Sequence, residues 1–316
     1  MCVGIRFTSA AGEMYFGRNY DWNMSYGERP LATPAGHETA WRFLPTSASA
    51  YRIIGMGITM GGMPMYFDAA NEAGLAIAGL SFPETSRFPA EAVAGKRNVA
   101  LFELPLWVTS TFGSVTELEA ALADTAIIGV PAYQGGQVAP LHWIVADATG
   151  SIVIESTERG LEVFHDDVDV LTNEPDFRWQ RTNLRNYLGA VSSKPTATSW
   201  NGAELAPMGH GGGMFGIPGD YSPASRFVKA AYVNTHYPAQ EGEAANVARM
   251  FRTLGSVFVP KGCVGMANGT WDATLYQGMY SAATRTYYYS TYDDPAIRAV
   301  ALDEVDFAGS ADVVAL

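Results

Sequence analysis

One residue near the start of the chain can combine a nucleophile with its own base. Cys2 directly follows Met1, and a cysteine is small enough for the initiator methionine to be removed. Cys2 would then carry a free α-amine beside its thiol. An unperturbed α-amino group titrates near ~7.7–8.0 and a thiol near ~8.5, so both groups are poised close to neutral pH. This pairing predicts a nucleophilic cysteine whose own amine is the general base.

An incidental cysteine at a start site is the alternative, so the neighbours of Cys2 matter. Residues 2–8 are rich in β-formers, and residues 14–19 are typical of a returning strand after a short turn. A hairpin brings the far end of its return strand alongside the start of the first. We therefore expect Arg18 and Asp21 beside Cys2, where a guanidinium favours a thiolate and a carboxylate holds an ammonium group. A surface salt bridge is the other interpretation of this charged pair.

Two distant residues have side chains suited to acyl transfer. Asn173 follows a short strand expected at 168–172, and an amide there serves either a turn or as a neutral donor to an oxyanion. Arg226 falls in the first turn of a helix expected from Ala224 to about Asn234, where a cation opposes the helix dipole. That cost indicates a specific partner for Arg226, such as a carboxylate or a substrate; a solvated arginine is the alternative.

The composition limits the class of protein. The 316 residues are 48% hydrophobic and 16% charged, which provides ample material for a core. The net charge of −12 argues against nucleic acid and against an anionic membrane surface as partners. No run of 18 apolar residues and no signal-peptide pattern is present, so we expect a cytoplasmic protein. The second cysteine, Cys263, is expected to be a small buried hydrophobe rather than half of a disulfide.

Other kinds of catalytic centre have little support in the sequence. The five histidines form no i, i+4 pair and no Cys/His cluster, and His165-Asp166-Asp167 is more typical of an acidic turn at a strand end than of a metal site. No nucleophile elbow and no dinucleotide fingerprint is present, and the glycine-rich run 209–216 lacks the ending of a phosphate loop. We therefore expect neither a metal nor a cofactor.

Strands and helices are expected to alternate in blocks along the chain. Residues 23–50 are polar and rich in turn formers. In the first half, the expected elements are strands at 2–8, 14–19, 51–59, 66–70 and 75–81, a loop at 59–65, a helix at 98–112 interrupted by Pro105, and a helix starting at the capping box Ser114–Glu117. In the second half, they are strands near 141–147, 151–156 and 161–165, helices at 176–188, 224–234 and 241–254, an aromatic hairpin at 271–291 and a strand at 296–303. This order, without a linker or a repeat, predicts one domain over residues 1–316, with two antiparallel sheets packed between helical layers.

Several separated motifs span nearly the whole chain. They are Met1-Cys2, Arg18-Asn19-x-Asp21-Trp22, Asn71-Glu72-x-Gly74-Leu75-x-x-Ala78-Gly79-Leu80, Leu171-Thr172-Asn173-x-Pro175, Gly216-Ile217-Pro218-Gly219-Asp220 with Ser225-Arg226-Phe227, and Thr291-Tyr292-Asp293-Asp294. In order and spacing they resemble the choloylglycine hydrolase family, that is, the bile salt hydrolases and penicillin V acylases of the N-terminal-nucleophile superfamily. The actinobacterial bile salt hydrolases look most similar.

The resemblance implies an α+β protein with an αββα sandwich, usually a homotetramer, that hydrolyses linear amides. It makes Cys2 the nucleophile and base, with Arg18 and Asp21 holding and polarising it. It also implies that Asn173 donates to the oxyanion and that Arg226 stabilises the charged intermediate.

A second oxyanion donor is implied at the backbone N–H of Ser81. Bile salt hydrolases typically carry Asn at this position and penicillin V acylases Tyr, so the serine leaves the substrate preference open. We expect a glycine- or taurine-conjugated bile acid as substrate, with penicillin V or an acyl-homoserine lactone as the nearest alternative and a non-catalytic steroid or lipid binder as a remote one. A rigid apolar steroid needs an apolar, aromatic pocket. From their positions in or near expected loops, the residues that we expect to line this pocket are Trp22, Met24, Met60, Met63, Phe67 and Tyr133.

Overall fold

Two antiparallel sheets pack face to face at the centre of the computed structural model, which describes residues 1–307 and 313–316. The first sheet contains, in spatial order, β14 (Val170–Leu171), β1 (Cys2–Thr8), β2 (Met14–Trp22), β18 (Trp271–Ser281), β19 (Thr286–Thr291) and β20 (Arg298–Ala301), and β17 (Val264–Gly265) pairs with β18. The second contains β13 (Gly160–Asp166), β12 (Ser151–Thr157), β11 (Leu141–Ala146), β8 (Ala76–Ser81), β7 (Met63–Asn71), β6 (Ile53–Met60), β3 (Arg29–Thr33) and β21 (Val314–Ala315).

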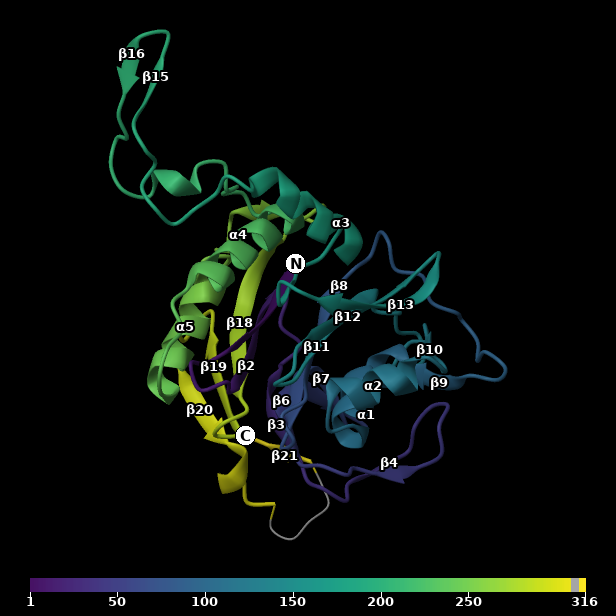
Figure 1. Cartoon of the computed structure of the whole chain (residues 1–316). Helices are drawn as coiled ribbons and strands as arrows, with labels where there is room; N and C mark the ends of the chain where they lie inside the picture. The colour runs from purple at the N-terminus through teal and green to yellow at the C-terminus, as the bar shows by residue number, and fades with distance from the viewer. Residues whose placement is uncertain (308–312) are drawn as a thin grey trace.

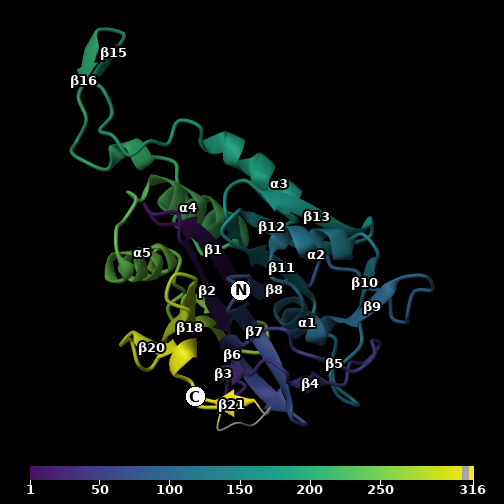
Figure 2. The same cartoon turned by 60° about the horizontal axis from the view of Figure 1, so that its bottom comes forward.

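Helices cover the outer face of each sheet. The helices α4 (Pro223–His236) and α5 (Glu243–Gly255) lie on the outer face of the first sheet (Figures 1 and 2). The helices α1 (Leu104–Thr111) and α2 (Val115–Leu122) lie on the outer face of the second sheet. The apolar face of α5 repeats at helical spacing, with Val247, Met250 and Leu254 buried. The order of layers is therefore helix, sheet, sheet, helix, which confirms the predicted αββα sandwich.

The alternation of side chains along β1 places Cys2 between the two sheets. Gly4 faces the second sheet so closely that an added Cβ would lie 2.6 Å from Cγ2 of Ile144. Phe7 faces the helices, because the guanidinium of Arg249 in α5 sits 3.8 Å from its ring centroid. Since side chains alternate with a period of two, Cys2 points to the same side as Gly4. The candidate nucleophile thus lies on the inner face of a central strand.

Two short segments differ from the sequence-based expectation around residues 59–65 and 98–112. The expected loop at 59–65 is the tip of the β6–β7 hairpin, and only Gly61 and Gly62, with φ of 59° and 86°, form the turn. Pro105 does not interrupt a helix: β9 (Arg97–Ala100) and a 3₁₀ turn, η1 (Leu101–Glu103), precede α1, and the proline lies in its first turn, where no N–H is needed. The strand β9 pairs in parallel with β10 (Thr125–Ile128).

Three further expectations also need correction. Cys263 is exposed rather than buried, because it lies in the turn that leads into β17. The segment 23–50 contains β3, a strand of the second sheet, and the small hairpin of β4 (Glu38–Thr39) and β5 (Ser47–Ala48). The helix expected at 176–188 is divided into α3 (Phe177–Asn183) and a 3₁₀ turn, η2 (Leu184–Tyr187).

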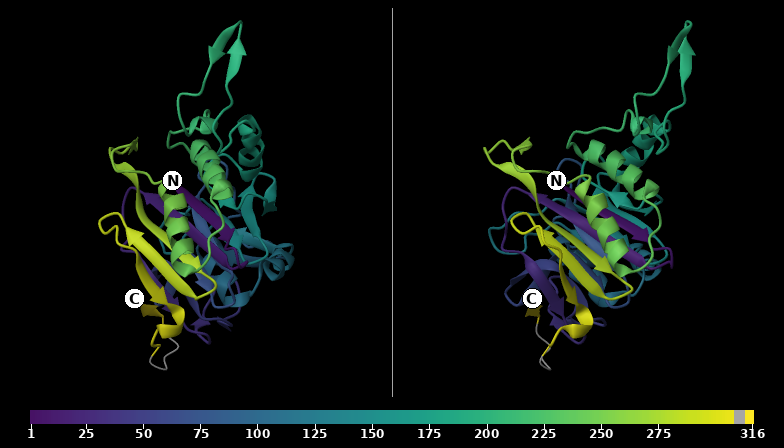
Figure 3. Two further views of the ribbon diagram at one scale, coloured as in Figure 1. Left: turned by 60° about the vertical axis from the view of Figure 1, so that its left-hand side comes forward. Right: turned by 90° about the vertical axis from the view of Figure 1, so that its left-hand side faces the viewer.

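An arm between η2 and α4 stands away from the layers. Its tip is the hairpin of β15 (Thr198–Trp200) and β16 (Ala203–Leu205), and its base contains the short η3 (Gly212–Met214). Both views of Figure 3 show the arm projecting from the end of the sandwich. A last 3₁₀ turn, η4 (Leu302–Glu304), follows β20. Among the described residues, no helix is long and apolar enough to cross a membrane.

Candidate active site

Cys2 is held rigidly, although it is the second residue of the chain. It opens β1, which pairs with β2 on one side and β14 on the other, and its register partner in β2 is Tyr20. Its side chain is only 3% exposed. A nucleophile on a strand with partners on both sides has little freedom, which suits positioned chemistry.

A buried guanidinium contacts the Cys2 thiol. Nη2 of Arg18 lies 3.0 Å from Sγ, and Arg18 pairs in register with Gly4, two residues from Cys2 and on the same face. The guanidinium packs against the rings of Tyr20 and Tyr276, at 4.9 and 5.7 Å from their centroids. A cation in this position favours the thiolate form of the cysteine.

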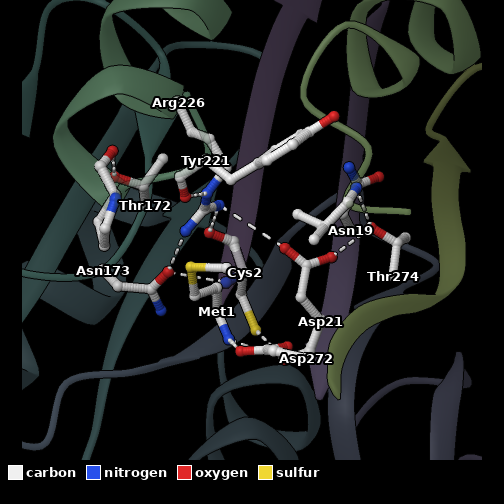
Figure 4. Close-up of polar contacts among 12 residues, drawn as sticks. Met1, Cys2, Asn19, Asp21, Thr172, Asn173, Tyr221, Arg226, Asp272 and Thr274 are labelled. Carbon is white, nitrogen blue, oxygen red and sulfur yellow. Dashed lines mark hydrogen bonds and ion pairs between the residues drawn. The ribbon is translucent and has the colours of Figure 1, made fainter. Parts of the chain in front are cut away.

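Asn173 and Arg226 meet at the backbone of Cys2. Oδ1 of Asn173 accepts hydrogen bonds from the Cys2 backbone nitrogen and from Nη2 of Arg226, both at 2.7 Å (Figure 4). Nη1 of Arg226 donates to the Cys2 carbonyl oxygen at 2.7 Å. The amide nitrogen of Asn173 donates to the carbonyl oxygen of Ser81, also at 2.7 Å. The segment after β14, the helix α4 and the strand β8 thereby each contribute a residue at one end of β1.

Arg226 reaches the site from the first turn of α4. The side chain of Ser222 caps this helix by accepting a hydrogen bond from the backbone N–H of Ser225. It is almost completely buried, and burial lowers its pKa, while the nearby Asp21 and Cys2 oppose that shift. These contacts explain why a cation occupies a helix start, where the dipole disfavours it.

Asp21 lies on the opposite face of β2 from Arg18. Its Oδ1 accepts a hydrogen bond from the Thr274 hydroxyl at 2.6 Å. Its Oδ2 lies 3.7 Å from Nη1 of Arg226, and this oxygen accepts no hydrogen bond from the described residues. Burial raises the pKa of Asp21, while Arg226, the terminal ammonium group and Thr274 oppose that shift. Only the backbone oxygen of Asp21 approaches the thiol, at 3.8 Å from Sγ.

The structure includes Met1, so the Cys2 nitrogen is an amide in it. The Met1 ammonium group lies 2.8 Å from Oδ2 of Asp272 and 3.0 Å from the backbone oxygen of Asp21 (Figure 4). Removal of Met1 would create a new ammonium group at the Cys2 nitrogen, which already faces Oδ1 of Asn173.

A family model described as linear amide C–N hydrolases, choloylglycine hydrolase family, matches residues 2–315. The chain belongs to this family. It is 49% identical over 313 residues to the bile salt hydrolase/transferase of Bifidobacterium longum subsp. longum, with 98% of each chain covered. It is 45% identical over 305 residues to the conjugated bile acid hydrolase of Lactobacillus acidophilus, with 96% of each chain covered.

The structure is similar to a crystal structure of the R18L variant of the conjugated bile acid hydrolase from Clostridium perfringens. The TM-score is 0.93 at 29% identity, over 100% of this chain and 96% of that one. This member of the family is therefore a hydrolase of linear amide C–N bonds, and it has the αββα fold of the N-terminal-nucleophile hydrolases.

Among the expected substrate-binding residues, the structure brings Trp22 and Phe67 close together, because both contact Tyr26. Phe67 stacks on Tyr20 at 5.1 Å between centroids and contacts Tyr26 edge-on at 6.1 Å. Nε1 of Trp22 donates to the Tyr26 hydroxyl at 3.1 Å. Tyr26 was not among the expected residues, although an aromatic residue shortly after the Asp21-Trp22 pair was a signal for it.

The other expected substrate-binding residues are more scattered. Met24 and Tyr133 are exposed, and Met60 lies at the tip of the β6–β7 hairpin. Met63 packs against the apolar cluster that includes α1 and α2, rather than the cluster that includes Cys2.

Sequence reasoning also missed Asp272 and Thr274, which lie in β18 beside Asp21 and the chain start. Two polar residues, two positions apart at the beginning of a strand rich in aromatic residues, were the available signal.

Proposed function

We propose that this protein hydrolyses the amide bond of glycine- or taurine-conjugated bile acids through a thioester on Cys2. The observation that carries the proposal is the convergence of Arg18, Asn173 and Arg226 on a cysteine at the start of the chain. The relatives named as bile salt and conjugated bile acid hydrolases support the substrate class, because they match over nearly their full length.

The reaction begins once Met1 has been removed. The Cys2 amine takes the thiol proton, directly or through water, and the thiolate attacks the carbonyl carbon of the substrate amide. The carbonyl oxygen becomes an oxyanion in the tetrahedral intermediate. Arg18 supports formation of the thiolate, because its Nη2 already contacts Sγ.

Asn173 and Ser81 are the proposed oxyanion donors. A side-chain amide has two N–H donors, and only one of those on Asn173 is used by the Ser81 carbonyl. The N–H and C=O of a strand residue point to the same edge. Because the Ser81 carbonyl points to Asn173, its N–H faces the same side, away from β11. Each such donor stabilises the transition state by roughly 3–4 kcal/mol in comparable sites.

Collapse of the intermediate breaks the C–N bond. The protonated Cys2 amine donates its proton to the departing nitrogen of glycine or taurine, which leaves an acyl thioester on Sγ. Water, activated by the same amine, then attacks the thioester and releases the bile acid. The buried charge of Arg226, beside the Cys2 carbonyl and Asn173, supports the negatively charged intermediates.

A comparison of three substrates tests the proposal. Purified protein is incubated with a taurine conjugate, a glycine conjugate and penicillin V, and the release of taurine, glycine and 6-aminopenicillanic acid is measured. We expect turnover of at least one bile acid conjugate at a rate well above that of penicillin V. Turnover of penicillin V alone would replace the proposal by the acylase alternative, and unchanged activity in Cys2→Ala would remove the thioester mechanism.

We also propose that residues 1–316 form one domain and that four copies assemble through the arm. Trp200 and Phe215 on the arm are 73% and 95% exposed, and Leu188, Leu205 and Met208 are exposed on the same segment. Exposed apolar side chains gathered on one projecting segment are typical of an interface. Light scattering after gel filtration tests this assignment: we expect the mass of a tetramer, and a smaller species for Trp200→Ser with Phe215→Ser. A monomeric parent protein would contradict it.

A further inference from the structure

A buried carboxylate lies beside the guanidinium that contacts the nucleophile. Oδ1 of Asp68 is 3.9 Å from Nη1 of Arg18, while Nη2 of the same guanidinium touches Cys2. Asp68 belongs to β7 in the second sheet, whereas Arg18 belongs to β2 in the first. Both side chains are almost completely excluded from solvent. A charge on one sheet therefore faces a charge on the other across the core.

Two tyrosines hold Asp68 in place. The hydroxyl of Tyr276 donates to Oδ1 at 2.5 Å, and the hydroxyl of Tyr287 donates to Oδ2 at 2.6 Å. Because both oxygens accept hydrogen bonds, Asp68 has the pattern of an ionised carboxylate. Burial raises the pKa of each tyrosine well above its usual value, so the two hydroxyls stay protonated and continue to donate.

The backbone around this cluster is shaped to allow it. Gly278 is the register partner of Arg18, and a Cβ at this position would lie 2.2 Å from the Tyr287 hydroxyl oxygen. A bulge in β7 interrupts the pairing with β6 between Tyr66 and Asp68. A bulge changes the direction of the side chains that follow it. As a result Phe67 stacks on Tyr20 while the adjacent Asp68 also reaches residues of the first sheet.

The charges of this cluster are coupled. Burial raises the pKa of Asp68, and Arg18 opposes that shift. Burial alone would lower the pKa of Arg18, but Tyr276, Cys2 and Asp68 outweigh it and raise that pKa. A buried guanidinium needs a counter-charge, and two groups are available to supply it: the Asp68 carboxylate and the Cys2 thiolate.

We propose that Asp68, held by Tyr276 and Tyr287, is a positioning residue that balances the charge of Arg18 and so limits how strongly Arg18 stabilises the Cys2 thiolate. The inference rests on the proposed function of Cys2. The physical benefit is that a thiolate becomes a weaker nucleophile as its basicity falls, and a thiol reacts best when it titrates near the ambient pH. Arg18 without Asp68 would over-stabilise the thiolate.

Several other groups face the Cys2 side chain or its backbone and remain constant in the test. They are Arg18 and Tyr20 from β2, Arg226 from α4, the backbone oxygen of Asp21, Asn173 after β14 and the amine of Cys2 itself. Asp68 acts on the thiol through Arg18, which is why its removal isolates the proposed effect.

The test is the pH dependence of Cys2 alkylation in full-length, processed protein. Wild type and Asp68→Asn are treated with iodoacetamide from pH 5 to 10, and modification is measured by peptide mass spectrometry. The exposed Cys263 reacts in the same tube and is the internal reference. The midpoint is the pH at which the alkylation rate of a cysteine reaches half of its maximum. We expect the midpoint for Cys2 to fall by about one pH unit in Asp68→Asn. A shift of this order is expected when one charge several ångströms away is removed at an effective dielectric constant of about 20. The midpoint for Cys263 should not change.

Matched variants separate this effect from general damage. Glu103→Gln removes another buried carboxylate, and Tyr15→Phe removes another tyrosine–carboxylate hydrogen bond, the one to Glu243. Neither should shift the midpoint for Cys2. If Asp68→Asn does not fold, Tyr287→Phe takes its place and should give a smaller shift in the same direction. The Asp68 carboxylate then loses one hydrogen-bond donor, so its ionised form is less stable.

An unchanged or higher midpoint in the folded variant would overturn the inference. Alkylation does not depend on turnover, so this outcome is distinguishable from failure of the proposed function, which an active Cys2→Ala variant would reveal.

Discussion

The side-chain oxygen of Asn173 lies 2.7 Å from the backbone nitrogen of Cys2, although 171 positions separate the two residues. The contact exists because β14, which ends two residues before Asn173, pairs with β1. The same oxygen accepts a hydrogen bond from Arg226, so one amide group links the start of the chain, the first sheet and α4. This link couples the position of the proposed nucleophile to that of the proposed oxyanion donor.

Replacing Asn173 tests that link. Asn173→Ala removes one oxyanion donor and one acceptor of Arg226, so we expect kcat to fall by about 10²–10³. The matched control is Asn186→Ala, which should leave kcat unchanged: it is an exposed amide whose hydrogen bond, among the residues that the structure describes, goes to Asn183. Steady-state kinetics with a conjugated bile acid measure both. A loss below tenfold in folded Asn173→Ala would contradict the oxyanion role.

Removal of Met1 is expected to determine activity. While Met1 is attached, the Cys2 nitrogen is an amide and cannot act as a base, and the Met1 ammonium group is bound to Asp272 and to the backbone of Asp21. Intact mass spectrometry of separated fractions reports the fraction that lacks Met1. We expect specific activity to be proportional to that fraction. Full activity in protein that retains Met1 would exclude the Cys2 amine as the base.

The start of α4 should lose stability in acid through Asp220. Hydrogen bonds from Ser222 and Ser225 lower the pKa of Asp220 to about 2. A carboxyl group whose pKa is lower in the folded state stabilises the fold above the unfolded value of about 4, and this contribution is lost as the pH falls towards about 2. Asp220 is exposed, so solvent screening limits the effect to under about 1 kcal/mol.

Asp220→Asn therefore should lower the midpoint of thermal unfolding at pH 7 by a few degrees at most, and the difference from wild type should vanish near pH 2. Calorimetry over this pH range, with Glu204→Gln on the exposed arm as control, measures the difference. An effect that persists at pH 2 would show that the hydrogen bonds of Asp220 do not depend on its charge.

The local part of the site could be predicted from the sequence, because a hairpin has a short and nearly obligatory register. The approach of Arg18 to Cys2 follows from it. The sequence analysis placed both Arg18 and Asp21 beside Cys2, but residues three positions apart on a strand lie on opposite faces, so only the Arg18 side chain reaches the thiol. The contacts of Asn173 and Arg226 with Cys2 depend on the pairing of distant strands and the docking of α4, so only the family resemblance indicated them.

The cluster around Asp68 was not predicted at all. Its position depends on a bulge in β7 and on how closely the two sheets approach, and neither has a local signal in the sequence. Tyr287 was visible only as part of an aromatic hairpin. The exposure of Cys263 was also missed, since a cysteine between Gly262 and Val264 is equally consistent with a buried turn and an exposed one.

Gly278 should be intolerant of a side chain because of Tyr287. A methyl group at Gly278 would lie 2.2 Å from the Tyr287 hydroxyl oxygen and 3.0 Å from Cζ, so one of them must move. We expect Gly278→Ala to lower the free energy of unfolding by about 1–3 kcal/mol, as overpacking of a core does. Urea unfolding followed by tryptophan fluorescence measures it.

A double-mutant cycle isolates the cause. Tyr287→Phe removes the hydroxyl oxygen that an alanine at position 278 would approach, so Gly278→Ala should cost less in that background than in wild type, by at least about 0.5 kcal/mol. Gly255→Ala, at the end of α5 with open space around its Cα, is the control and should be neutral or slightly stabilising. If the cost of Gly278→Ala is the same with and without the hydroxyl group, the glycine serves the strand pairing of β18 rather than the hydrogen bond from Tyr287 to Asp68.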